Sequence, residues 1–149
     1  MGFQLTSSAF NDGDKIPSVY TCDGKNNSPP LAWRDAPTGT LGFALVVNDP
    51  DAPAGDWGHW VLYNIPSSVT HLDEAFDSGQ SSLLEGKNSW GHERYDGPCP
   101  PSGVHRYIFT LYALSHNINE PSLTKTQLLS RLKGITLDKT TLMGRYQKQ

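Results

Sequence analysis

The sequence Asn48-Asp49-Pro50-Asp51-Ala52-Pro53, followed by Trp57-Gly58-His59-Trp60, brings two carboxylates and an imidazole into one turn-rich connection. The apolar run 43–47 leads into this connection, and the apolar run 61–65 leads out of it. Each run has the length and the near-continuous apolar character of a strand that is buried on both faces. The sequence therefore predicts two buried strands that deliver polar side chains to one turn.

A second group of polar residues opens a third strand-like segment. The stretch Gly103-Val104-His105-Arg106-Tyr107 begins an apolar run that continues to residue 114. Because side chains alternate along a strand, His105 and Tyr107 share one face and Arg106 lies on the other. We expect Arg106 to have a structural role, paired with Asp51. Together with the first group, these residues predict a small polar pocket at the end of a buried sheet.

The remaining pattern predicts a mostly β chain with one helix late in the sequence. Strands are predicted at residues 3–6, 31–33, 42–48, 60–65 and 105–114, with a last strand or turn at 141–146. The helix is predicted at 122–133, where Thr124 and Gln127 fit a capping box and Gly134 occupies a C-cap position. We expect the sheet to be antiparallel or mixed.

The connections between these elements are rich in turn residues. Within the segment 67–88, residues 72–76 are predicted to form one helical turn, and the rest is predicted to be loop. The segment 89–102 contains two glycines and three prolines, and its length is typical of a functional loop. Three histidines are predicted to be surface residues without partners: His71, His92 and His116.

Length, charge and hydropathy limit the classes of function. The 149 residues fit one domain, 1–149, which is large enough to bury a core without cross-links. The net charge of −3 does not indicate a basic surface that would bind nucleic acid, so a nucleic-acid-binding function is not expected. The sequence contains no apolar run long enough to span a membrane and no signal peptide pattern, so we expect a cytoplasmic protein. Cys22 and Cys99 would stay reduced in that compartment, although the sequence also allows them to pair.

Several short motifs follow one another along nearly the whole chain. Four of them surround the predicted pocket: Asp49-Pro50-Asp51-Ala52-Pro53, Gly58-His59-Trp60, Gly97-Pro98-Cys99-Pro100-Pro101 and Gly103-Val104-His105-Arg106-Tyr107. Three more lie elsewhere: Tyr20-Thr21-Cys22-Asp23-Gly24, Ser28-Pro29-Pro30-Leu31 and Leu142-Met143-Gly144-Arg145-Tyr146. The first group resembles the two signature regions of the phosphatidylethanolamine-binding protein family, also called the Raf kinase inhibitor protein family. The second group resembles the bacterial branch of that family.

The resemblance implies a fold in which a large central β-sheet packs on a smaller sheet, with peripheral helices. It also implies a pocket that binds a small anion such as phosphate, acetate or phosphorylethanolamine. Among the classes of function, we expect a non-enzymatic binding protein without a cofactor. Regulation of a kinase or another protein partner is a further implication, and a homodimer is left open. The matching pocket residues are Asp49, Pro53, His59, Pro100, Pro101, His105 and Tyr107.

The chemistry of these residues can also be considered directly. A phosphate monoester needs several hydrogen-bond donors, which two histidines and the hydroxyl group of Tyr107 would supply. The carboxylate of Asp49 would repel an anion. Its presence is explained if it orients a histidine, accepts a hydrogen bond from an ammonium group or is protonated through burial.

Other interpretations of the same residues remain open. His59, His105 and Asp49 could form the site of a metal-dependent hydrolase, although the chain has no His-x-x-x-His pair. Cys99 or Ser102 could be a hydrolase nucleophile, although the Gly-x-Ser-x-Gly motif is missing. A purely structural interpretation also exists, because carboxylates beside prolines are common turn formers.

Overall fold

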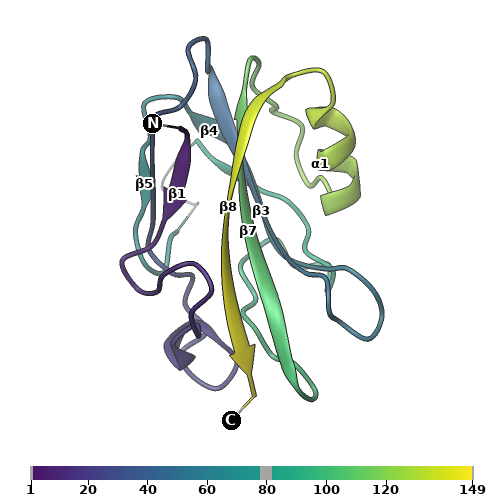
Figure 1. The fold of residues 1–149 in the computed structure, drawn as a ribbon. Coiled ribbons are helices and arrows are strands. Elements are labelled where there is room, and N and C mark those ends of the chain that lie inside the picture. Colours follow the sequence, from purple (N-terminus) through teal and green to yellow (C-terminus); the bar gives the residue numbers. More distant parts are fainter. Residues whose placement is uncertain (1, 78–81, 149) are drawn as a thin grey trace.

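The computed structural model describes residues 2–77 and 82–148, and it contains two antiparallel sheets that lie face to face (Figure 1). The larger sheet has the order β6-β4-β3-β7-β8 and is formed by β3 (Gly42–Asp49), β4 (Trp57–Pro66), β6 (Leu84–Glu85), β7 (Val104–Leu114) and β8 (Thr136–Gln147). The smaller sheet has the order β1-β2-β5 and is formed by β1 (Gln4–Thr6), β2 (Leu31–Arg34) and β5 (His71–Leu72). The predicted mostly β fold with a large and a small sheet is confirmed.

The central strand β3 divides its side chains between two cores. Phe43, Leu45 and Val47 pack between the two sheets, whereas Ala44 and Val46 face the helix on the other side of the larger sheet. Since neighbouring residues of a strand point to opposite faces, both sets must be apolar. This double burial explains why the sequence of β3 shows an apolar run without alternation.

The helix α1 (Lys125–Leu132) covers the face of the larger sheet opposite the small sheet (Figure 1). Its capping box is present: the Thr124 hydroxyl accepts a hydrogen bond from the Gln127 backbone N–H, and the Gln127 side chain accepts one from the Thr124 N–H. Leu128 is fully buried beneath the helix, and Gly134 follows the helix with a φ of 82°. The helix therefore has the predicted caps, although it begins three residues after Ser122.

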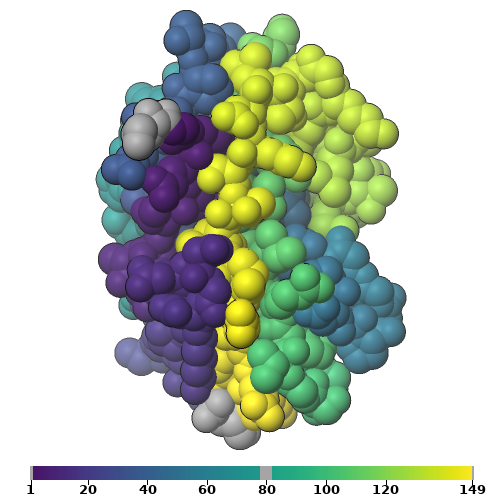
Figure 2. Space-filling view, viewed as in Figure 1, coloured from purple at the N-terminus to yellow at the C-terminus, as the bar shows by residue number. Residues whose placement is uncertain are grey.

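The C-terminal strand β8 is longer than the predicted segment 141–146, and the N-terminal segment lies along it. Figure 2 shows this segment in purple beside the yellow strand. Ile16 N–H donates to the Arg145 carbonyl at 2.8 Å, and Arg145 N–H donates to the Asp14 carbonyl at 2.9 Å. This pairing covers part of the edge of β8, which lies at one end of the larger sheet.

The segment after β4 differs from its prediction. The predicted helical turn at 72–76 is wrong, because Leu72 belongs to β5 and pairs with Leu31 of β2. Ala75 has a φ of 56°, which is incompatible with a right-handed helix. The strand β6, within the predicted loop, pairs with β4. Residues 78–81 of the predicted loop lie outside the described residues.

The two cysteines also differ from expectation, because Cys22 and Cys99 form a disulfide bond. Two loops far apart in sequence meet here, and they bring the Cα atoms to 5.4 Å, within the range of a disulfide. In the described part of the chain, no helix is long and apolar enough to cross a membrane.

The packing of α1 predicts that alanine substitutions at two leucines have very different effects on stability. Leu128 is 0% exposed beneath the helix, whereas Leu137 on β8 is 43% exposed. We expect Leu128→Ala to lower the free energy of unfolding by about 2–5 kcal/mol, because it leaves a cavity. The control Leu137→Ala should change it by less than about 0.5 kcal/mol. Urea denaturation followed by circular dichroism measures both values, and equal effects would contradict the packing described here.

Candidate functional site

A cavity of about 270 Å³ opens at the end of the larger sheet where β3 ends and β7 begins. All seven residues singled out from the sequence line it, although they lie on four separate segments: Asp49, Pro53, His59, Pro100, Pro101, His105 and Tyr107. Five further residues complete the lining: Ala52, Ala54, Trp57, Trp90 and Cys99. The sequence analysis did not assign these five residues to the pocket.

A buried carboxylate and a buried imidazole form the polar floor of the cavity. The Nδ1 atom of His105 lies 2.6 Å from Oδ2 of Asp49. The two strands bring them together because Asn48 of β3 pairs with Ile108 of β7, so the next residue of β3 lies near Tyr107. The Asp49 carboxylate therefore orients the His105 ring, which is one of the roles considered for it from the sequence.

Tyr107 completes this floor with its hydroxyl group. Burial raises the pKa of Tyr107 far above its ordinary value, and the negative charge of Asp49 and a hydrogen bond with Asp49 add to the effect. The hydroxyl group therefore stays protonated beside Asp49.

His59 reaches the cavity from a bulge in β4. Val47 pairs with Trp60 but Asn48 pairs with Gly58, so His59 has no opposite residue on β3. Strict alternation from Trp60, which packs between the sheets, would place the His59 ring on the opposite face. A bulge re-aims a side chain in this way.

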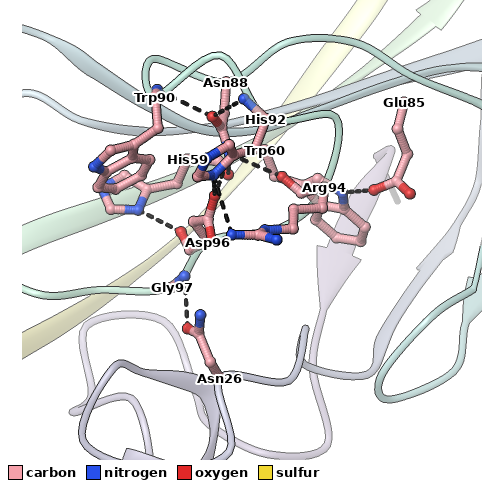
Figure 3. Close-up of polar contacts among 10 residues, drawn as sticks. All are labelled: Asn26, His59, Trp60, Glu85, Asn88, Trp90, His92, Arg94, Asp96 and Gly97. Carbon is pink, nitrogen blue, oxygen red and sulfur yellow. Dashed lines mark hydrogen bonds and ion pairs between the residues drawn. The ribbon is translucent and has the colours of Figure 1, made fainter.

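The backbone of Asp96 fixes the ring of His59 (Figure 3). Its carbonyl lies 2.6 Å from Nδ1 of His59, and its N–H donates to the His59 carbonyl at 3.1 Å. Burial lowers the pKa of His59, and this effect outweighs the opposing hydrogen bond to Asp96 and the charge of Asp49. His59 is therefore a neutral imidazole whose Nδ1 carries the proton.

The side chain of Asp96 organises the loop behind His59 (Figure 3). It interacts with Asn88 Nδ2 at 2.7 Å, His92 Nδ1 at 2.8 Å and Arg94 Nε at 3.1 Å. Burial alone would raise the pKa of Asp96, but these hydrogen bonds together hold it below its ordinary value. His92 was predicted to have no partner, and that prediction is wrong because the loop turns back on itself.

A row of aromatic rings forms one wall of the cavity. The rings of Trp57 and Trp90 meet edge to face at 5.5 Å, and those of Trp90 and His59 do so at 5.0 Å. The ring of Tyr107 follows, 5.1 Å from His59. Trp90, which lies between Trp57 and His59 in this row, is 44% exposed. Its backbone N–H donates to the Asn88 side chain, so the loop that holds His59 also holds the wall.

Arg106 pairs with Asp51, as the sequence predicted, and lies outside the residues that line the cavity. Its Nε and Nη2 atoms donate to the two carboxylate oxygens at 2.9 and 2.8 Å, and its backbone N–H donates at 3.0 Å. These hydrogen bonds lower the pKa of Asp51 to about 2. The pair is largely exposed, so it contributes less to stability than a buried ion pair would.

Neither hydrolase interpretation gains support from the geometry. Within residues 2–77 and 82–148, no three side chains of His, Cys, Asp or Glu are grouped so that they could hold a metal ion. The sulfur of Cys99 is bonded to that of Cys22 and is therefore not a free thiolate nucleophile.

The loop behind His59 leads to a pH-dependent prediction. Because the folded state lowers the pKa of Asp96, its ionised form stabilises the fold above the unfolded pKa of 3.8, and this contribution is lost as pH falls through the folded value. We expect Asp96→Asn to lower the free energy of unfolding by about 1–3 kcal/mol at pH 7. The difference from wild type should shrink in acid.

Urea denaturation at neutral and acidic pH measures this difference, and Asp73→Asn is the matched control because Asp73 is almost fully exposed. A loss that is equal at both pH values would contradict an ionised Asp96 at the centre of the loop.

Comparison with known proteins places this chain and its fold in a family. The profile of the family described as phosphatidylethanolamine-binding protein matches residues 6–147. The UPF0098 protein of Methanothermobacter thermautotrophicus is 46% identical over 97% of this chain and 98% of its own. The crystal structure of CT736 from Chlamydia trachomatis matches with a TM-score of 0.93 and 40% identity over 99% of each chain. That of YbcL from Escherichia coli matches with a TM-score of 0.91 and 31% identity over 100% of each chain. The chain therefore belongs to the phosphatidylethanolamine-binding protein family.

Proposed function

We propose that this protein binds a small anionic group, such as phosphate, acetate or a phosphorylated headgroup, in the cavity at the end of the larger sheet. The observation that carries the proposal is the pair of imidazoles around one cavity, each with its Nδ1 atom held by an acceptor of the protein. His105 is held by the carboxylate of Asp49, and His59 by the carbonyl of Asp96. The Nε2 atom of each ring is therefore the one that can form a hydrogen bond with a ligand.

The two imidazoles have different electrostatic surroundings. The buried carboxylate of Asp49 can balance a positive charge on His105, whose Nε2–H would then donate to an anionic oxygen. His59 lacks such a partner at Nδ1 and is neutral, so its Nε2 atom accepts a hydrogen bond. A phosphate monoester that carries one proton offers both an anionic oxygen and a hydroxyl group.

The apolar walls strengthen these few polar contacts. The prolines, alanines and tryptophans that surround the polar floor exclude water, and hydrogen bonds to charged groups gain strength in such surroundings. The volume of about 270 Å³ suits a headgroup-sized ligand rather than a whole lipid. We keep kinase regulation and a homodimer outside this proposal, because the contacts above concern a ligand cavity alone.

The proposal predicts a pH dependence that sulfate can isolate, since sulfate does not titrate near neutral pH. An anion favours the charged imidazole, so binding should take up protons and the affinity should weaken as pH rises. Burial holds the pKa of His59 below 6.5. The loss of affinity that results from deprotonation of His59 should therefore occur on the acidic side of neutral pH. Isothermal titration calorimetry in two buffers of different ionisation enthalpy measures the proton uptake.

Two substitutions assign this uptake to residues. His59→Ala and His105→Ala should each weaken sulfate binding and reduce the proton uptake, because each removes one of the two imidazoles that line the cavity. A sulfate affinity that is flat across this pH range and indifferent to both substitutions would show that the imidazoles do not bind the anion.

Arg106 provides the control for electrostatic effects at a distance. Its guanidinium group is paired with Asp51 outside the cavity. Arg106→Ala should therefore bind sulfate with nearly the affinity of the wild type, after circular dichroism has shown that the variant is folded. A folded Arg106→Ala variant that no longer binds would place the guanidinium group within the site.

A further inference from the structure

The disulfide bond between Cys22 and Cys99 lies at the border of the proposed binding cavity. Both cysteine residues are exposed, and Cys99 is part of the cavity lining. Exchange of a disulfide requires that a thiolate reach one of the sulfur atoms, so exposed bonds are the reactive ones. The bond thus combines access from solvent with a position in the binding site.

The wall that carries Cys99 has few other attachments. Pro98, Pro100 and Pro101 have no backbone N–H group, so Cys99 supplies the single backbone donor of residues 98–101. The carbonyl of Pro98 accepts a hydrogen bond from the Cys22 N–H at 3.1 Å. The disulfide bond and this hydrogen bond therefore join the proline wall to the same residue.

The neighbouring backbone is packed tightly against the loop that carries Cys22. Gly97 N–H donates to the Asn26 side chain at 2.8 Å, and the Tyr95 hydroxyl donates to the Tyr20 carbonyl at 2.7 Å. A Cβ atom on Gly97 would lie 2.2 Å from the Tyr20 carbonyl oxygen. The disulfide bond thus closes a contact between two loops that ends at the cavity.

Cys99 lies beside the polar floor, because it lines the same cavity as Tyr107, Asp49 and His105. Asp49 holds Nδ1 of His105 at 2.6 Å. A displacement of Cys99 therefore changes the surroundings of Tyr107 and of the Asp49–His105 pair.

We propose that the Cys22–Cys99 disulfide is a thiol-reactive site whose redox state sets the anion affinity of the cavity. In the reaction, a thiolate of a dithiol reductant attacks one sulfur atom and the other leaves as a thiolate. The second thiol of the reductant, as a thiolate, then attacks the reductant's sulfur in the mixed disulfide, and the second cysteine leaves as a thiolate. The reductant becomes a disulfide, and the protein gains two electrons and two protons as two thiols. This proposal rests on anion binding as the function of the cavity.

The experiment compares the oxidised and the dithiothreitol-reduced protein. We expect the sulfate dissociation constant to rise by about fivefold or more on reduction, the lower end of typical coupling between two sites. Because the coupling is reciprocal, sulfate should stabilise the disulfide bond. A higher ratio of reduced to oxidised dithiothreitol should then be needed to reduce half of the protein. Amide hydrogen exchange should also become faster at Gly97 and Cys99 in the reduced protein.

The variant Cys22→Ser removes the tether and leaves Cys99 in the wall, so in the presence of reductant it should match the reduced wild type. Dithiothreitol should not change the sulfate affinity of the Cys22→Ser/Cys99→Ser variant. If reduction leaves both the sulfate affinity and the exchange of Gly97 and Cys99 unchanged, the proposal is overturned. If the oxidised protein does not bind sulfate at all, the proposed function fails instead, and the exchange measurement still tests the tether.

Discussion

A carboxylate at the end of a doubly buried strand is the constraint on which this end of the molecule depends. Asp49 ends β3 and is almost fully buried, so its oxygens need hydrogen-bond donors from the surrounding segments. His105 supplies one from β7, and the Asp51 N–H supplies another at 2.8 Å from the turn itself. Asp51 then accepts three hydrogen bonds from Arg106. The two carboxylates of one turn thus fix the start of β7 from both faces.

The second imidazole depends on a separate network, which keeps the two rings different. His59 is held by backbone atoms of Asp96, and the Asp96 side chain is held by Asn88, His92 and Arg94. A carbonyl partner does not balance a charge as a carboxylate does, so burial decides the protonation of His59. The two histidines of one cavity are therefore held by different partners, a carboxylate and a backbone carbonyl.

The sequence predicted the elements whose pattern is local. The runs at 43–47 and 61–65 are apolar because the larger sheet is covered on both faces, and the Thr124–Gln127 box lies within one turn of helix. The seven cavity residues came from the motifs of a known family, and alternation along β7 correctly separated His105 from Arg106. These predictions needed no information about which distant segments meet.

Features that depend on distant segments could not be read in the same way. The strand β5 has only two residues and is defined by its pairing with β2, so its own sequence carries no clear strand pattern. The bulge at His59 is a mismatch between two strands, and neither strand shows it alone. The sequence allowed Cys22 and Cys99 to pair, but only the contact between their loops decides it. The partners of Asp96 likewise follow from the path of an irregular loop.

The division of the cavity between strands and loops has a consequence for binding. Asp49, His59, His105 and Tyr107 lie on strands of the larger sheet, whose register is fixed by long antiparallel pairings. The prolines, Trp90 and Cys99 lie on connections that have fewer backbone hydrogen bonds. Polar atoms on rigid elements are held in a geometry suited to one charged group. In the proposed function, the sheet would hold the charged group, and the apolar walls on the loops would contact the rest of the ligand.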